Sequence, residues 1–193
     1  MKGSLSQILY GYVFIFLAIR VGVDILADPI GYFLIAAGCY KIGEFFYDGR
    51  TAAYISMALI FFSIPSVFID FNLVESGPWY YYSNFLFTGE LVLTFYLFRM
   101  LKKIAERNGE QGLAQRTQRL FMIYIPANLV MLALSALLTV IVFESLQGVA
   151  IVLVVLLLIL NIAFLILLGA FRKAVRDEEP PLILNEEERS KYI

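Results

Sequence analysis

The feature that most constrains this chain is an apolar run near its C-terminus, residues 149–171, that contains no charged side chain. A helix that crosses the hydrocarbon core of a bilayer, about 30 Å thick, needs roughly 20 such residues. A soluble fold could not cover this surface, because only 16% of the residues are charged, against about 25% in ordinary soluble domains. The sequence therefore predicts an integral membrane protein. It excludes a disordered chain, a nucleic-acid-binding protein and an ordinary soluble enzyme.

Five further apolar segments have the length of a membrane span or fall just short of it. The six predicted spans are residues 5–23, 29–46, 52–69, 79–100, 120–143 and 149–171. We therefore expect an all-α fold, a polytopic membrane helix bundle with six transmembrane helices, in one domain over residues 1–175. The acidic, proline-containing residues 176–193 are expected to form a flexible cytoplasmic tail.

The breaks between spans carry residues that begin or end helices. Asp28 and Pro29 form a helix start, because aspartate can cap free N–H groups and proline is tolerated in the first turn. Gly77 with Pro78 is expected to open the fourth span, and Asn108 with Gly109 to end its cytoplasmic extension. Inside spans three and five, kinks are expected at two prolines, Pro65 and Pro126.

The positions of lysine and arginine predict the orientation. All but one of the 15 Lys and Arg residues fall at the N-terminus, around the turns after the second and fourth spans, or in the tail. Cytoplasmic loops are enriched in these residues, so both termini are predicted to be cytoplasmic. The first two spans are short and charged near their ends, and a re-entrant hairpin with four full crossings elsewhere is the alternative.

Three polar residues are predicted to lie at mid-depth: Glu90 in span four, Asn128 in span five and Asn161 in span six. Hydrogen bonds among them could join these spans, which is the structural interpretation. A binding or proton-handling site is the functional interpretation, because ionisable groups inside a membrane are costly and often mark a substrate or proton path. Glu90 is the strongest candidate.

A second group, Arg20, Asp24 and Asp28, lies between spans one and two. Arg20 and Asp24 are one helical turn apart and could form an ion pair near the outer interface, with Asp28 as a helix cap. The functional alternative is a polar outer vestibule between the two spans.

A third group follows span four. Four bases of this segment could contact anionic lipid headgroups: Arg99, Lys102, Lys103 and Arg107. The simpler interpretation is that they determine topology only.

Residues 23–38, VDILADPIGYFLIAAG, resemble a segment found in small integral membrane proteins of Gram-positive bacteria that have no assigned activity. The matching residues are Asp24, Asp28, Pro29, Ile30, Gly31 and Tyr32. The resemblance implies a multi-pass protein of the bacterial plasma membrane and no particular chemistry. Size and helix number are also similar to those of the substrate-binding membrane subunits of energy-coupling-factor vitamin transporters, at the level of fold alone.

Three functions remain open. The leading hypothesis is a non-enzymatic accessory or regulatory helix bundle, with the lipid bilayer and a membrane-protein partner or second copy as its contacts. The alternative is a small-solute or proton-coupled transporter, or a substrate-binding membrane subunit, that uses Glu90. An intramembrane enzyme comes last, since no nucleophile–base pair or nucleotide fingerprint is found. With no histidine and one cysteine, Cys39, no cofactor, metal site or catalytic residue is predicted.

Overall fold

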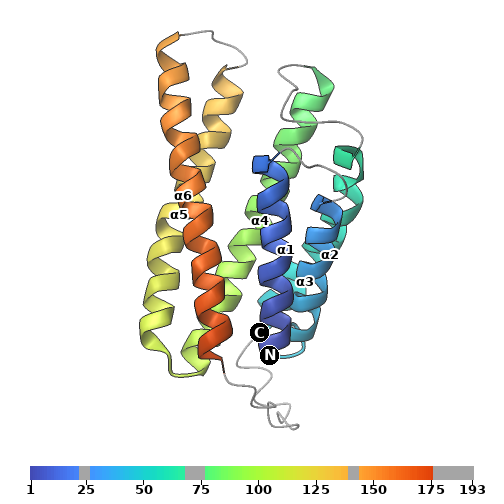
Figure 1. The fold of residues 1–193 in the computed structure, drawn as a ribbon, viewed down its shortest axis with the longest axis vertical. Helices are drawn as coiled ribbons and strands as arrows, with labels where there is room; N and C mark the ends of the chain where they lie inside the picture. The colour runs from blue at the N-terminus through green and yellow to red at the C-terminus, as the bar shows by residue number, and fades with distance from the viewer. Residues whose placement is uncertain (22–26, 68–76, 139–143, 176–193) are drawn as a thin grey trace.

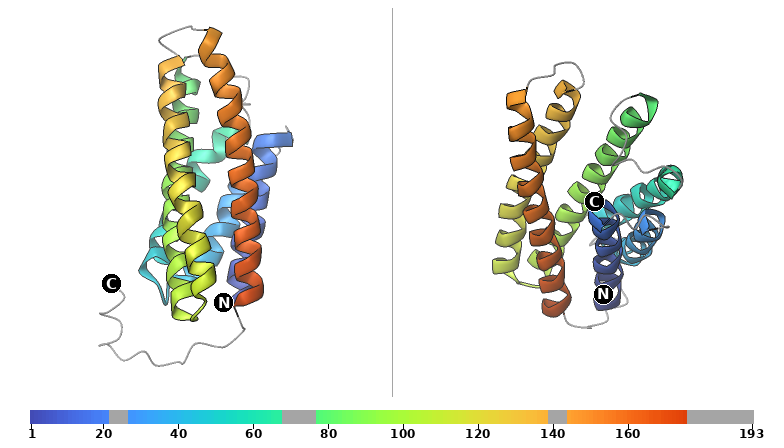
Figure 2. Two further views of the ribbon diagram at one scale, coloured as in Figure 1. Left: turned by 90° about the vertical axis from the view of Figure 1, so that its left-hand side faces the viewer. Right: turned by 45° about the horizontal axis from the view of Figure 1, so that its top comes forward.

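The computed structural model describes residues 1–21, 27–67, 77–138 and 144–175, and these form an all-α structure (Figure 1). The elements are α1 (Lys2–Val21), α2 (Ala27–Ile42), α3 (Tyr47–Ser63), the 3-10 helix η1 (Ile64–Val67), α4 (Pro78–Arg107), α5 (Gln111–Leu138) and α6 (Glu144–Ala174). The helices run alternately up and down and pack as a closed ring, in which each helix contacts the next and α6 returns to α1 (Figures 1 and 2).

Four stretches of the described helices are long and apolar enough to cross a membrane. They are Tyr47–Val67, Pro78–Arg107, Gln111–Leu137 and Ile151–Ala174. The remaining helices, α1 and α2, have 20 and 16 residues, which correspond to about 30 and 24 Å at a rise of 1.5 Å per residue. The multi-pass helical architecture thus agrees with the sequence, whereas six full crossings and the cytoplasmic position of the termini stay predictions.

One end of the bundle collects the basic residues. The start of α1, the turns α2–α3 and α4–α5, and the end of α6 all lie there (Figure 1). We call it the basic end, and its described Lys and Arg residues are Lys2, Lys41, Arg50, Arg99, Lys102, Lys103, Arg107, Arg116, Arg119, Arg172 and Lys173. The alternation of charge along the sequence therefore corresponds to the alternation of helix direction in space.

The helix ends agree with the sequence at two of the expected breaks. Gly77 has a positive φ of 87° directly before Pro78 opens α4, and Gly109 has a φ of 72° in the turn after α4. Glycine adopts this left-handed conformation without steric cost. Pro65 lies in η1, where the α-helical pattern of α3 gives way to a 3-10 turn, because proline offers no N–H for an α-helical bond.

The helices extend beyond the predicted spans. Predicted span four ends at residue 100 and span five begins at residue 120, whereas α4 continues to Arg107, as its expected cytoplasmic extension, and α5 already begins at Gln111. The segment between them is polar, yet Lys, Glu, Gln, Arg and Ala are good helix formers. Similarly, α2 begins at Ala27, so that Asp28 lies inside its first turn, where an acidic side chain still favours the helix dipole.

Helices α1 and α2 approach each other at glycines. A Cβ atom added at Gly11 would lie 2.5 Å from the carbonyl oxygen of Gly31, and one added at Gly38 would lie 2.5 Å from the carbonyl oxygen of Ser4. No side chain fits in either place. The glycines therefore allow the backbones of α1 and α2 to pack in direct contact, as small residues do at interfaces between membrane helices.

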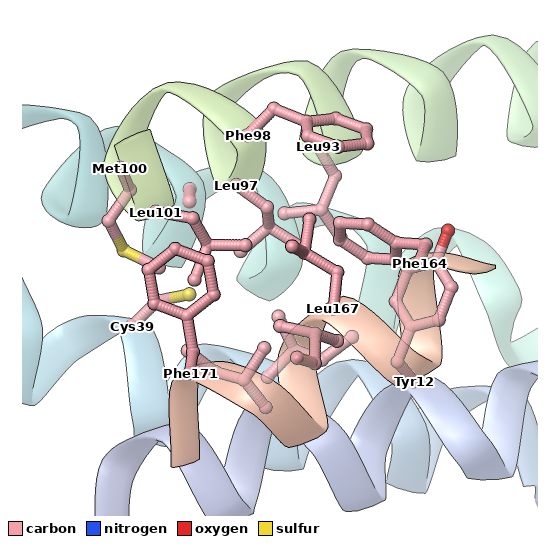
Figure 3. Packing of buried hydrophobic residues seen from close by; sticks show 14 of the residues in the cluster. Tyr12, Cys39, Leu93, Leu97, Phe98, Met100, Leu101, Phe164, Leu167 and Phe171 are labelled. Atoms are coloured by element: carbon pink, nitrogen blue, oxygen red, sulfur yellow. The ribbon is translucent and has the colours of Figure 1, made fainter. Parts of the chain in front are cut away.

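The apolar core lies where α1, α2, α4 and α6 meet. Leu97, Leu101 and Phe164 are fully buried there, and Phe171 packs in the same cluster (Figure 3). At one edge of this cluster, the ring of Tyr12 meets the ring of Phe164 edge-on, with 4.7 Å between their centroids. The ring of Tyr12 thus belongs to the apolar core, while its hydroxyl group contacts polar side chains.

Candidate functional site

A cavity of about 100 Å³ lies inside the bundle, between α1, α4, α5 and α6. Its apolar wall is formed by Phe16, Phe87, Leu91 and Leu157. Its polar wall consists of Tyr12, Glu90, Thr94, Tyr124, Asn128 and Asn161. A space of this size has room for several water molecules or for a small solute.

The three residues predicted at mid-depth all line this cavity. Glu90 is half-buried on α4, Asn128 is 4% exposed on α5, and Asn161 is half-buried on α6. The bond that Asn128 donates stays within its own helix, from Nδ2 to the carbonyl of Tyr124 at 2.8 Å. The structure thus brings the three residues to one cavity. Their role there stays a prediction.

Two tyrosines and a threonine, which the sequence did not single out, connect the helices. The hydroxyl of Tyr124 donates to Oδ1 of Asn161 at 2.8 Å. The hydroxyl of Tyr12 lies 2.9 Å from that of Tyr124 and 3.3 Å from Oγ1 of Thr94. The Tyr12 hydroxyl can also donate to Oδ1 of Asn161, at 3.5 Å. We call this cluster the hydroxyl chain; α4, α1, α5 and α6 contribute one residue each to it.

A periodicity in the sequence could have revealed these residues. Thr94 follows Glu90 by four positions and Tyr124 precedes Asn128 by four, so each pair shares one helix face. In addition, Tyr12 stands inside an apolar segment, away from the interfacial belts where tyrosine is enriched in membrane proteins. A search for a second polar residue one helical turn away from Glu90 and from Asn128 would therefore have found Thr94 and Tyr124.

Glu90 supplies the ionisable group of the cavity. Among the described residues that line it, Glu90 carries the single carboxyl group. It lies one helical turn before Thr94, beside the start of the hydroxyl chain. The site therefore combines one carboxyl group with hydroxyl and amide groups that can both donate and accept hydrogen bonds.

The basic end contains a second polar cluster, centred on a residue that the sequence analysis missed. Asp48 lies in the first turn of α3 and is 1% exposed. Its Oδ2 is 2.9 Å from Nζ of Lys103 and its Oδ1 is 3.5 Å from Nε of Arg99. Both bases are on α4, four residues apart, so one buried carboxylate fixes the start of α3 to one face of α4.

The four bases predicted to contact lipid headgroups lie at two different positions on the bundle. Arg99, Lys102 and Lys103 line a cavity of about 220 Å³ between α4 and α5. Arg107 instead lies over the ring of Phe46, 5.6 Å from its centroid. The structure thus brings three of the four bases together and separates the fourth.

The predicted group between spans one and two is described only in part. Oδ2 of Asp28 accepts a hydrogen bond of 3.4 Å from Ser66, which links the start of α2 to η1, the 3-10 helix that follows α3. Arg20 belongs to α1, but its side chain and all of Asp24 lie outside the described residues. The ion pair and the outer vestibule therefore stay predictions.

Within the described part of the chain, no three His, Cys, Asp or Glu side chains gather in a way that could hold a metal ion. Comparison of the chain with protein-family models, with curated proteins and with solved structures finds no match. The resemblance of residues 23–38 to small bacterial membrane proteins accordingly stays a prediction.

Proposed function

We propose that this multi-pass membrane protein binds a small polar solute in the cavity beside Glu90, as a transporter or a substrate-binding membrane subunit does. The observation that carries the proposal is the cavity itself, a space of about 100 Å³ between four helices that is lined by six polar side chains. Placing polar side chains inside a bilayer costs free energy. Polar side chains around a cavity can recover part of this cost, because they replace the hydration shell of a polar ligand.

The depth of the cavity supports this proposal. Tyr12, Glu90 and Tyr124 lie about 15, 18 and 20 Å from the first residues of their helices, at a rise of about 1.5 Å per residue. Helices α1 and α5 start at the basic end and α4 starts at the opposite end, so helices that run in opposite directions place these polar groups near the middle of the bundle. Binding sites of secondary transporters typically lie at this depth.

The size of the cavity limits the ligand. About 100 Å³ is below the 300–1,000 Å³ of typical pockets for drug-sized molecules. The solute class that fits contains only a few non-hydrogen atoms and has hydrogen-bonding groups for Tyr12, Asn161 and Glu90. A proton exchanged at Glu90 would provide the coupling ion in a transporter of this kind.

The test is whether water-soluble reagents reach the cavity. Leu91 lines it, whereas its neighbour Val92 is 42% exposed on the outer surface of the bundle. With the protein reconstituted in liposomes, Leu91→Cys is expected to react with a small charged thiol reagent, because thiolates form only where water enters. Val92→Cys, facing lipid, is expected to remain unmodified. The unsubstituted protein gives the background of the buried Cys39.

The same assay identifies the solute. A panel of small polar compounds is screened for protection of the Leu91→Cys protein against the reagent, and protection is expected to disappear when Glu90→Gln is added. The matched control is Glu110→Gln, an exposed residue outside the cavity. No labelling of Leu91→Cys, or equal labelling of Leu91→Cys and Val92→Cys, would overturn the proposal.

One observation favours a second candidate, the non-enzymatic accessory helix bundle. The hydroxyl chain from Thr94 to Asn161 connects four helices, and its side chains form hydrogen bonds with one another. Such a network can serve as polar glue between transmembrane helices. If the Leu91→Cys protein is folded and the reagent does not label it in the absence of any solute, the cavity is dry, and this result supports the accessory helix bundle.

A further inference from the structure

The cavity of about 220 Å³ between α4 and α5 lies at the basic end, separate from the cavity at mid-bundle. The polar residues on its α4 side are Arg99, Lys102, Lys103 and Glu106, and those on its α5 side are Thr117 and Gln118. The three bases follow the spacing i, i+3 and i+4, which places them on one face of the helix. The three bases and Glu106 form a wall with an excess of positive charge, opposite polar groups of α5.

The charge of this cavity is positive even after its ion pairs are counted. Lys102 lies 3.8 Å from Glu106, and Asp48 contacts both Arg99 and Lys103. Three cations therefore face two carboxylates. The side chains of Arg99 and Lys102 are still 49% and 42% exposed, so each retains donors for another anion.

The lining is also amphiphilic. Phe98 and Phe121 contribute rings to the same cavity. Directly beyond Phe121, Met122 and Ile123 are exposed on the outer surface of α5, in a segment apolar enough to cross a membrane. Cationic groups thus lie next to an apolar surface, which is the arrangement that a phospholipid requires.

We propose that this cavity binds the phosphate group of an anionic phospholipid, with Arg99, Lys102 and Lys103 as cationic ligands and Phe121 beside an acyl chain. Arginine and lysine are the common phosphate ligands of proteins, and basic pockets between transmembrane helices bind phosphorylated headgroups. Asp48 acts as a positioning residue, because it holds Arg99 and Lys103 from the buried side. This proposal is independent of what occupies the cavity beside Glu90.

The experiment measures lipid binding to the detergent-purified full chain by native mass spectrometry. Phosphatidylglycerol is titrated against phosphatidylcholine, and inorganic phosphate is added in a third arm. Binding of phosphatidylglycerol in preference to the other two is expected. Saturable binding of inorganic phosphate with no lipid preference would overturn the lipid assignment, and equal binding of both lipids would overturn the requirement for an anion.

The variants leave the contacts of Asp48 intact. Lys102→Gln removes one cation, and Gln118→Glu adds a carboxylate to the opposite wall of the cavity. Each is expected to weaken phosphatidylglycerol binding by about ten-fold, the worth of one charge-assisted contact. The control, Arg116→Gln, removes an exposed cation of α5 outside the cavity and is expected to change binding by less than about two-fold. Equal losses in Arg116→Gln and Lys102→Gln would overturn the proposal, since they would indicate diffuse attraction to the basic end.

Discussion

Gly11 and Tyr12 are consecutive residues of α1 that meet opposite kinds of surface. At Gly11, the backbone of α2 comes so close that a single added carbon would lie 2.5 Å from the carbonyl oxygen of Gly31. At Tyr12, the next residue, α1 faces a cavity and two hydroxyl groups, from Thr94 of α4 and Tyr124 of α5, with the amide of Asn161 from α6 beside them. The same helix thus takes part in two interfaces: a closely packed one with α2, which we call the sealed interface, and a polar one that borders a cavity.

The difference between these interfaces shows how helices associate in lipid. Apolar side chains gain little by leaving hydrocarbon for one another, so association depends on close packing and on hydrogen bonds. The α1–α2 interface uses close packing, because small residues allow backbone contact. The interface around Tyr12 uses hydrogen bonds and leaves a space between the helices. A binding site can form in the second interface and not in the first.

The largest expected effect belongs to the sealed interface. Gly11→Ala places a Cβ against the backbone of α2, and either α1 or α2 must move. We expect the free energy of unfolding to fall by about 2–3 kcal/mol, as for other overpacked cores. Denaturant titration in mixed micelles measures it.

The matched control for this prediction is Gly169→Ala on α6, where an added Cβ would meet nothing within 4 Å. This variant is expected to keep or slightly raise stability, because alanine favours helices. If Gly11→Ala were as stable as Gly169→Ala, the two interfaces of α1 would not differ in the way described.

A smaller loss is expected in the polar interface. Tyr124→Phe removes the hydroxyl that donates to Asn161 and contacts Tyr12. We expect a loss of about 1–2 kcal/mol, the range for hydrogen bonds between transmembrane helices and for buried groups left without a partner. The same titration measures it, with Tyr81→Phe as the control, because Tyr81 is 70% exposed. A loss no greater than that of the control would mean that the hydroxyl chain contributes nothing to stability.

The smallest expected effect has the opposite sign. Leu157→Phe adds volume where α6 borders the cavity, so we expect stability to rise by about 0.5–1 kcal/mol, as when other cavities are filled. Protection of the Leu91→Cys protein by the solute should be lost at the same time. Leu168→Phe, at a fully buried position of the same helix, is expected to destabilise instead. Destabilisation by both substitutions would show that the space beside Leu157 cannot accept a larger side chain.

The sequence alone predicted that the chain is helical and where several of the helices begin or end. Long apolar runs give helices, and Gly77 with Pro78 and Asn108 with Gly109 mark breaks that the structure contains. These features are local, because they depend on backbone conformations that glycine and proline allow or forbid. The start of α5 at Gln111 was less predictable. Hydropathy indicates which residues are apolar enough to lie in lipid, but a helix can begin several residues before that apolar segment.

The tertiary structure decided which side chains meet. Glu90, Asn128 and Asn161 could be placed at similar depths by counting residues, but depth does not reveal which way each helix is rotated. The rotation of α1 brings Tyr12 to Tyr124, 112 positions away, and the packing of α3 on α4 buries Asp48 against Lys103. Contacts of this kind depend on how the helices fit against their neighbours, and therefore only the packed bundle determines them.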